Sequence, residues 1–285
     1  MKIVIKFAGA LLEDAATVKS LALQVAQLAT QGHEILVVHG GGKIFTATLK
    51  RLGIESRFVA GLRVTDRETR DVAVMVFAGL LNKQLAAAIS AAGQPAVGIS
   101  AADAECFRAE PLVHNDVQGS LGYVGYLTGA NTGLLASFWK EGLVPVAACL
   151  GLGPDGELYN INADHMAAAC AEYLQADQLI YLTDVAGVMD GERTLAEIGC
   201  DDIERLVQNK TVAGGMVLKL EAAKRALEGG VRSVHIVGGS TPDALATAVR
   251  SADLATNGAL PGTRISRQPF LMTISAVRSA SLSAV

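Results

Sequence analysis

Short apolar runs alternate along the chain with longer stretches in which apolar residues recur every three or four positions. The short runs are rich in valine and isoleucine, which is typical of parallel strands buried on both faces. We predict such strands at residues 3–7, 35–39, 96–99, 144–148, 179–183 and 234–237.

The longer stretches have the periodicity of amphipathic helices. The longest begins at Thr65, where Glu68 completes a capping-box pattern, and runs with few breakers to Ala92. Residues 54–64 and 106–126 carry β-prone residues and glycines without a helix between them, so we expect hairpins there. Further helices are predicted at residues 15–31, 132–141, 163–174, 203–208, 216–228 and 243–250.

Strands that alternate with helices of this length are joined by right-handed crossovers and pair in parallel. The order of elements therefore predicts an α/β fold, a three-layer αβα sandwich with a mostly parallel central sheet. The composition agrees with a large buried core, since 51% of the residues are hydrophobic and only 18% are charged.

Charge and cysteine usage narrow the possible functions. The net charge of −4 argues against a nucleic-acid surface, which needs a basic excess. The four cysteines form no CxxC pair and no zinc spacing, so we expect reduced core cysteines and no metal held by protein side chains. The sequence shows neither a signal peptide nor an unbroken apolar stretch of about 20 residues. We therefore expect a cytoplasmic protein that does not contact a membrane.

Three consecutive glycines follow the strand predicted at residues 35–39, in the segment His39-Gly40-Gly41-Gly42-Lys43. Glycines at a strand-to-helix turn leave backbone N–H groups open to an anion, next to the positive end of the helix. A tight turn alone needs one glycine rather than three, so the segment favours phosphate binding. It matches neither the P-loop nor the GxGxxG pattern of dinucleotide sites.

Charged residues stand beside other turns of this kind. Lys6 ends the first predicted strand and is a candidate phosphate ligand, although a lysine at a strand end is more often solvated. Asn162 suits an N-cap, which leaves Asp164 in the first helical turn, where an acid commonly balances the helix dipole. Lys219 lies in the first turn of another helix and opposes its dipole unless an anion is near.

Two more residues have an informative setting. Arg63 lies between apolar neighbours in a predicted hairpin, and an arginine in such a place usually has a carboxylate partner. His39 ends an apolar strand, so we expect a buried, hydrogen-bonded histidine rather than a catalytic base.

Taken together, these segments resemble the amino acid kinase family, and within it the kinases that phosphorylate acetylated glutamate. The resemblance covers Met1 to about Ile265, and its segments occur in the order of the family. They are residues 6–9, 39–42, 61–65, 82–83, 122–125, 160–164, 182–188, 215–219 and 262–263.

The resemblance implies ATP-dependent phosphorylation of the side-chain carboxylate of N-acetyl-L-glutamate to an acyl phosphate, the second step of arginine biosynthesis. Because a carboxylate is already ionised at neutral pH, this reaction needs no general base. Catalysis then consists of positioning and charge stabilisation. The resemblance also implies Mg²⁺, held mainly by the ATP phosphates and water.

Individual roles follow from the same resemblance. Lys6 and Lys219 would contact the transferring phosphoryl group, and Asp164 would hold both lysines. The backbone N–H groups of Gly9 and Gly41 would donate hydrogen bonds to the phosphoryl oxygens. The residues against the acylated amino acid would be Gly41, Gly42, Arg63 and Asn160. The residues against the nucleotide would be Asp184, Val185, Ala186, Gly187, Val188, Met189, Thr211, Val212 and Ala213.

A two-lobed organisation is also implied. Residues 1–150 would bind the acylated amino acid and form the dimer, and residues 151–265 would bind ATP. The Ser- and Ala-rich tail at residues 266–285 has no counterpart in the family, and its role is unknown.

Dimerisation would use the long helix predicted between Thr65 and Ala92, which has too few charges for a fully exposed helix. In this family, arginine-inhibited hexamers carry an extra helix ahead of the first strand. The first strand here begins at Lys2 or Ile3, so we expect a homodimer that arginine does not inhibit.

Other functions remain open at this point. A kinase for N-succinylglutamate or for a carrier-linked aminoadipate would use the same ATP lobe. A regulatory relative without transfer is suggested by Ala8, because the family has glycine there and a positive φ would strain alanine. A nicotinamide oxidoreductase is disfavoured, because GxGxxG is missing.

Overall fold

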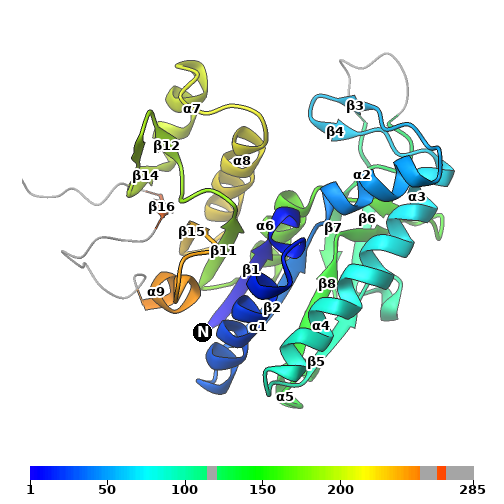
Figure 1. Cartoon of the computed structure of the whole chain (residues 1–285), viewed down its shortest axis with the longest axis horizontal. Helices are drawn as coiled ribbons and strands as arrows, with labels where there is room; N and C mark the ends of the chain where they lie inside the picture. Colours follow the sequence, from blue (N-terminus) through cyan, green and yellow to red (C-terminus); the bar gives the residue numbers. More distant parts are fainter. Residues whose placement is uncertain (114–120, 251–261, 268–285) are drawn as a thin grey trace, which may run out of the picture.

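The centre of the fold is an eight-stranded sheet in the order β14-β16-β15-β11-β1-β2-β8-β5 (Figure 1). The computed structural model describes residues 1–113, 121–250 and 262–267. Neighbouring strands pair in parallel, except β15 and β16, which are antiparallel. The strands are β1 (Lys2–Phe7), β2 (Glu34–His39), β5 (Ala96–Ile99), β8 (Val144–Ala148), β11 (Gln178–Thr183), β14 (Glu197–Gly199), β15 (Ser233–Gly238) and β16 (Thr263–Ser266). All six strands that we predicted are present, whereas β14 and β16 were missed.

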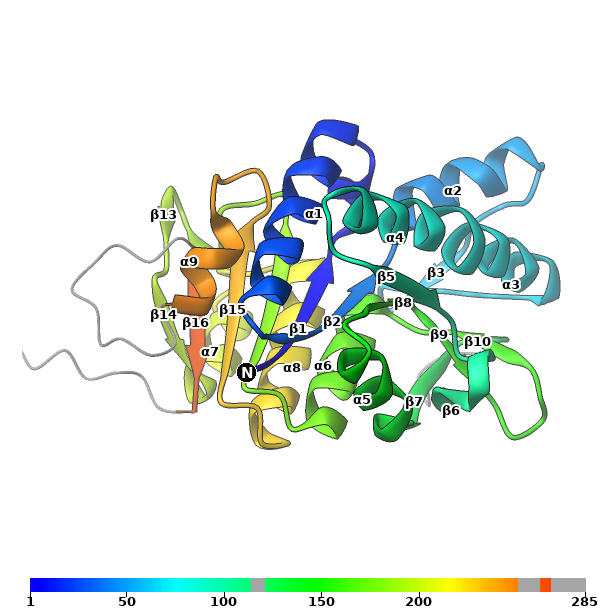
Figure 2. The same cartoon turned by 90° about the horizontal axis from the view of Figure 1, so that it is seen from below.

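Helices cover both faces of the sheet, as Figure 2 shows from below. One face carries α1 (Ala15–Thr30), α4 (Asn82–Ala91) and α9 (Ala244–Arg250). The other face carries α5 (Thr132–Lys140), α6 (Ala163–Leu174), α7 (Cys200–Gln208) and α8 (Gly215–Glu228). The predicted three-layer αβα sandwich with a mostly parallel sheet is confirmed.

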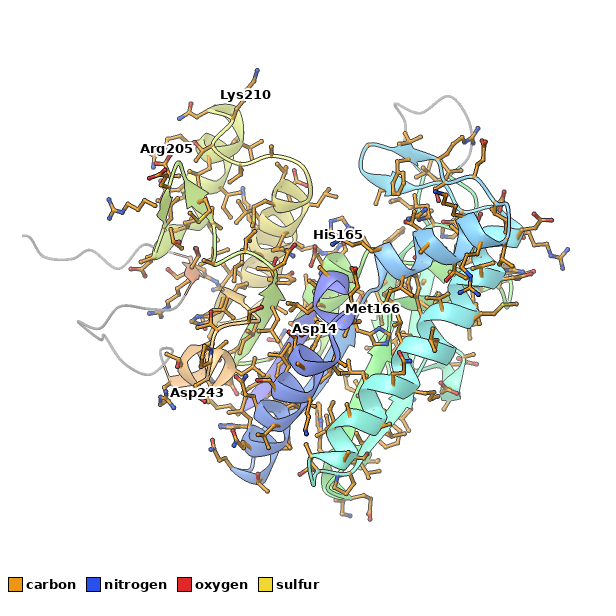
Figure 3. The ribbon with its side chains drawn as sticks, in the orientation of Figure 1. Asp14, His165, Met166, Arg205, Lys210 and Asp243 are labelled. Carbon is orange, nitrogen blue, oxygen red and sulfur yellow. The ribbon has the colours of Figure 1, made fainter. Side chains whose placement is uncertain are left out.

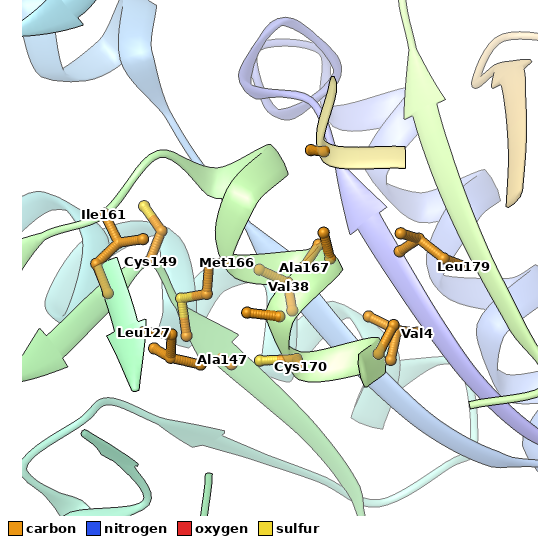
Figure 4. Packing of buried hydrophobic residues seen from close by; sticks show 14 of the residues in the cluster. Val4, Val38, Leu127, Ala147, Cys149, Ile161, Met166, Ala167, Cys170 and Leu179 are labelled. Atoms are coloured by element: carbon orange, nitrogen blue, oxygen red, sulfur yellow. The ribbon is translucent and has the colours of Figure 1, made fainter. Parts of the chain in front are cut away.

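The core forms two hydrophobic clusters, one on each face of the sheet, because successive side chains of a strand point to opposite faces. In β1, Ile3 and Ile5 join the cluster with α1, whereas Val4 joins the cluster with α6. Figure 4 shows Val4 of the sheet together with Ala167 and Cys170 of α6. Small side chains on α6 let this helix lie close to the sheet, which positions its first turn. All four cysteines are buried and free, as predicted.

The long helix begins later than predicted and is not uniform. It comprises α3 (Arg67–Ala73), a π-helical segment η2 (Val74–Leu81) and α4. Its N-cap is Asp66, whose carboxylate accepts from the Thr69 N–H at 2.8 Å, so the predicted cap at Thr65 is wrong. Aspartate is at least as good an N-cap as threonine, and this one stands one position later. By length and composition the helix could cross a membrane, but half of its apolar window is buried in the protein.

Both predicted hairpins are present beyond one edge of the sheet. The first pairs β3 (Phe58–Val59) with β4 (Leu62–Arg63). The second pairs β6 (Phe107–Pro111) with β7 (Gly125–Ala130), within a small sheet that also contains β9 (Leu150–Leu152) and β10 (Leu158–Asn160). Shorter elements are η1 (Gly9–Leu12), α2 (Gly42–Arg51), η3 (Asp103–Glu105), β12 (Met189–Asp190) and β13 (Arg193–Thr194).

The division into lobes near residue 150 stays a prediction, since one sheet runs through both halves. Of the predicted tail at residues 266–285, residues 268–285 lie outside the described residues.

Candidate active site

The candidate residues follow strands that run in the same direction. Lys6 lies near the carboxyl end of β1, Gly40 follows β2, and Asp184 follows β11. In a parallel sheet these ends meet at one edge, which is the usual place for a ligand. The fold therefore brings segments from both halves of the chain to one site.

Two glycine turns touch at this edge. A β-carbon added at Gly9 would lie 3.0 Å from the Cα of Gly41 and 3.0 Å from the backbone N of Gly42. A β-carbon on Gly41 would collide with Leu81 of η2. Gly41 is the N-cap of α2 and offers no side chain to its first turn, so backbone N–H groups there can face an anion. Only glycine suits this contact, which agrees with the phosphate-binding prediction.

A buried cluster of three charges lies beside the glycine turns. One oxygen of Asp164, Oδ1, accepts from Lys6 Nζ at 2.7 Å and from Lys219 Nζ at 2.8 Å. Both lysines are less than 10% exposed, at 7% and 6%. The predicted N-cap is confirmed: Asn162 Oδ1 accepts from the backbone N–H of Asp164 at 2.9 Å, which fixes the carboxylate in the first turn of α6. Solvation of Lys6, the common alternative at a strand end, is therefore ruled out.

The cluster holds one more positive charge than negative charge. Burial by itself raises the pKa of Asp164, but Lys6 and Lys219 outweigh it and lower the pKa to about 2. Burial, together with the charge of Lys6, lowers the pKa of Lys219 to about 8, although Asp164 opposes this. A second anion beside the lysines would relieve this imbalance, because opposite charges at short range favour the charged forms.

A cavity of about 170 Å³ opens next to the glycine turns. Its lining includes four residues predicted to bind substrate, which are Gly41, Gly42, Arg63 and Asn160. Asn160 is held in place by hydrogen bonds from its Nδ2 to Thr65 Oγ1 at 3.2 Å and from its backbone N–H to the Tyr123 carbonyl at 2.8 Å.

Arg63 is buried in the wall of this cavity without a protein carboxylate. Its Nη2 donates to Thr46 Oγ1 at 2.6 Å, and its Nη1 donates to Ser56 Oγ. The guanidinium lies over the rings of Phe45 and Phe58, at 4.8 and 4.4 Å from their centroids. Within the described ranges no ion pair reaches Arg63, so a carboxylate partner from the chain itself was a wrong expectation. The guanidinium therefore brings a positive charge to the cavity wall that none of the described carboxylates neutralises through an ion pair, and such a charge is suited to a carboxylate ligand.

The histidines and cysteine near the site are poor bases and nucleophiles. His39 is fully buried, with Nδ1 bonded to the Gly40 carbonyl at 3.0 Å and Nε2 near Asn82 Nδ2 at 3.2 Å, as predicted. Burial lowers the pKa of His39 to about 4. Cys149 lines the cavity, and burial raises the pKa of its thiol to about 12. Figure 3 shows His165 at the start of α6, where burial lowers its pKa.

The predicted nucleotide segments lie further from the charge cluster. Asp184 to Val188 form the turn after β11, and Met189 begins β12. In this turn Thr263 Oγ1 accepts from the Val188 N–H at 2.8 Å. Thr211 to Ala213 precede α8. The side chains of Val188 and Val212 are buried in the core, so only their backbones could meet a ligand. No hydrogen bond or ion pair among the described residues joins either segment to the charge cluster.

Sequence reasoning missed several residues of the site. Thr46 and Ser56 hold Arg63 between two aromatic rings, and Tyr181 lies with its ring 4.8 Å from Lys219 Nζ. The strands of Lys6 and Tyr181 were both predicted, but their register was not, and no local signal pointed to the hydroxyl partners of Arg63.

The donor set does not form a metal cage. In the part of the chain that the structure describes, no three His, Cys, Asp or Glu side chains lie close enough together to hold a metal ion. The Asp164 oxygen nearest the lysines is already shared by two ammonium groups. Ammonium and backbone N–H donors fit an anionic ligand that brings its own cation.

Known proteins resemble the chain over most of its length. The model of the amino acid kinase family matches residues 1–238. Acetylglutamate kinase of Koribacter versatilis is 52% identical over 248 residues, which are 86% of this chain and 93% of that protein. Acetylglutamate kinase of Acidobacterium capsulatum is 45% identical over 238 residues, which are 83% and 90%.

A solved structure gives the same fold. N-acetylglutamate synthase from Neisseria gonorrhoeae, complexed with coenzyme A and N-acetyl-glutamate, superposes with a TM-score of 0.80 at 27% identity. The match covers 94% of this chain but 60% of the synthase, so the chain spans less than two thirds of that protein. The family model covers the strands and glycine turns that build the site, and the chain belongs to the amino acid kinase family.

Proposed function

We propose that this protein is an acetylglutamate kinase, which transfers the γ-phosphoryl group of ATP to the side-chain carboxylate of N-acetyl-L-glutamate. The observation that carries the proposal is the pair of buried lysines that share one oxygen of Asp164 beside two touching glycine turns. The identity to two acetylglutamate kinases supports the choice of substrate.

The substrate is held by its carboxylate and its acyl group. The guanidinium of Arg63 pairs with one carboxylate of the acylated amino acid, and Asn160 and the Gly41–Gly42 backbone bind the rest. The volume of the cavity, about 170 Å³, suits a compact acyl amino acid. The buried Phe45 ring shields one side of the guanidinium from water, which strengthens the pair.

The chain's own groups then stabilise the transfer. A side-chain carboxylate oxygen of the substrate forms a bond to the γ-phosphorus while the bond from phosphorus to the β–γ bridging oxygen breaks, leaving ADP. Lys6, Lys219 and the N–H groups of Gly9 and Gly41 bind the phosphoryl oxygens, where charge accumulates. Asp164 is a positioning residue that keeps both ammonium groups aimed at this point.

Mg²⁺ accompanies ATP and neutralises charge on its phosphates. It would be held by phosphate oxygens and water, since the lysines and backbone N–H groups of the site would bind the phosphates rather than the cation. The nucleotide lies against residues 184–189 and 211–213, in the C-terminal half, and the acyl amino acid lies in the N-terminal half. We place this ATP-dependent reaction in the cytoplasm.

The backbone at Ala8 removes the reason for proposing a regulatory, non-catalytic protein. Ala8 has φ −67° and ψ 142°, an extended conformation that any residue adopts, so its methyl group causes no strain. The ion pairs of Lys6 and Lys219 with Asp164 also support an enzyme.

The test measures ADP release by the purified protein with N-acetylglutamate, N-succinylglutamate and a carrier-linked aminoadipate, with hydroxylamine added to trap the acyl phosphate. N-acetylglutamate should give the highest kcat/KM and a hydroxamate equal to the ADP released. ADP release without hydroxamate would indicate simple ATP hydrolysis and contradict the proposal. Higher kcat/KM with another acyl amino acid would change the substrate but keep the chemistry.

A further inference from the structure

Tyr181 contacts every member of the charge cluster. It is the Cα partner of Lys6 in the parallel pairing of β1 and β11. The centroid of its ring lies 4.8 Å from Lys219 Nζ, and its hydroxyl donates to the backbone carbonyl of Asp164 at 3.1 Å. The side chain is completely buried.

We propose that Tyr181 is a positioning residue for the transfer, and that its ring holds the Lys219 ammonium in place while the N–H groups of that lysine turn to the phosphoryl group. This inference rests on the proposed kinase function. It assigns to an aromatic ring a task that Asp164 cannot perform alone.

The reason lies in how the two lysines share one acceptor. Both ammonium groups lie within 2.8 Å of the same oxygen, so they repel each other. An ammonium has three donors, and each donor used on Asp164 is unavailable to phosphate. The face of an aromatic ring attracts the whole cation through its quadrupole, and at 4.8 Å from the centroid this attraction does not require an N–H group aimed at the ring. The ring therefore fixes Lys219 without occupying the donors that the reaction needs.

The hydroxyl has a separate structural task. By donating to the Asp164 carbonyl it links β11 to the first turn of α6. It touches neither lysine through a hydrogen bond in the structure. The two parts of the side chain can therefore be separated by substitution, which makes the proposal testable.

The matched variants are Tyr181→Phe, which keeps the ring, and Tyr181→Leu, which removes it. Tyr181→Met is a third variant that refills the core with an unbranched chain if leucine does not fold. With N-acetylglutamate, we expect Tyr181→Phe to keep kcat within about 3-fold, and Tyr181→Leu to lower kcat about 5- to 30-fold at unchanged KM, which is the strength of a buried cation–π contact. A raised KM with unchanged kcat would overturn the proposal.

A second readout does not depend on activity. The ionisable groups around Lys219 Nζ are Lys6 from β1, Asp164 from α6 and Tyr181 from β11. NMR titration of ¹³Cε-labelled lysines, with Lys219→Met to assign the signal, reports the pKa of Lys219 directly. Loss of the ring should lower this pKa by about 0.7 to 1.5 units in Tyr181→Leu or Tyr181→Met, because the ring favours the charged form. The pKa in Tyr181→Phe should equal that of the wild type.

The kinetic assay and the titration of Lys219 test the kinase function and the role of the Tyr181 ring separately. If the wild type phosphorylates no acyl amino acid but Lys219 titrates as expected, the kinase function falls and the role of the ring in holding Lys219 stands. If Lys219 titrates alike in all variants, the role of the ring is wrong even in an active kinase.

Discussion

At the scale of single residues, the site works by placing charge rather than by moving protons. The described histidines near it are buried and hydrogen-bonded or have lowered pKa values, and the nearby cysteine has a raised pKa. What remains are lysines, one aspartate and backbone N–H groups. Such a site is sensitive to the loss of single positive charges.

The first prediction concerns those charges. Lys6→Ala and Lys219→Ala should each lower kcat about 100- to 1,000-fold, which is the effect of losing one preorganised donor to charge in the transition state. Arg63→Lys should mainly raise KM for the acyl amino acid, because a point charge replaces a bidentate fork. Steady-state kinetics with each substrate varied separates the two effects. Near-normal turnover in both lysine variants would refute the mechanism.

Ionisation of Lys219 gives a second prediction. Its pKa lies below the usual 10.5, at about 8, because burial and the neighbouring Lys6 disfavour the charged form. Since the charged form is the active one, kcat/KM should fall as the pH rises through about 8. Lys219→Arg should be slower but should lose this alkaline limb, because an arginine stays protonated. An identical pH profile in both proteins would show that another group titrates.

Ala8 gives a third prediction. Because its φ is −67°, the position gains nothing from glycine. Ala8→Gly should leave kcat/KM within about 2-fold and lower the free energy of unfolding by about 0.4–1 kcal/mol, through greater freedom of the unfolded chain. Urea denaturation measures the second quantity. A more stable or more active glycine variant would mean that the backbone is strained in solution.

At the scale of elements, Arg70 of α3 holds one wall of the cavity in place, although it does not itself line the cavity. Arg70 is 7% exposed, and its guanidinium donates to Asp71 Oδ1 and to the Glu157 carboxylate. The guanidinium also lies over the Tyr123 ring, 4.5 Å from the centroid. The backbone of Tyr123 in turn accepts from the Asn160 N–H. This series of contacts runs from α3 to β10 and ends at a residue that lines the cavity.

Arg70→Met should therefore raise KM for the acyl amino acid about 10-fold with little effect on kcat, and should lower stability by about 1–3 kcal/mol through the loss of charged hydrogen bonds. The control is Arg205→Met on α7, which breaks an exposed ion pair with Asp202 far from the cavity (Figure 3). Its effect on stability should be below about 1 kcal/mol, with no change in KM. Equal KM values for the two variants would exclude a role for Arg70.

The elements show what could be predicted from the sequence. The six strands and the helix N-cap at Asn162 were predicted, because their signals are local: apolar runs and an amide before a helix. β14 and β16 were missed because they are short, and β16 is held between β14 and β15 by pairings that the local sequence does not reveal. The sandwich of Arg63 between Phe45 and Phe58 was missed as well, because these residues come from separate elements. The order of the motifs predicted Lys6 and Lys219 as site residues. The place of Tyr181 beside Lys6 follows from the register of β1 and β11, which the sequence does not reveal.

At the scale of the whole molecule, the long helix and the edge of the sheet favour association. β5 is the last strand at one edge of the sheet. The η2 segment of the long helix exposes two large apolar side chains, Met75 at 65% and Leu80 at 48%. We expect a homodimer, because a two-fold pair would cover this apolar surface. Light scattering should give twice the mass of the chain, and Met75→Glu with Leu80→Glu should give monomers. A wild-type monomer would contradict this prediction.

The position of β1 also has a consequence for biosynthesis. This strand precedes the other described strands along the chain, yet it lies in the middle of the sheet, between β2 and β11. Phe7 ends β1 and Gln178 begins β11, so about 170 residues must be translated before the second edge of β1 finds its partner. At the usual rates of synthesis this takes roughly 10–30 s. During that time we expect the growing polypeptide to expose an unpaired hydrophobic strand edge, which is a surface that chaperones would need to protect until β11 pairs with β1.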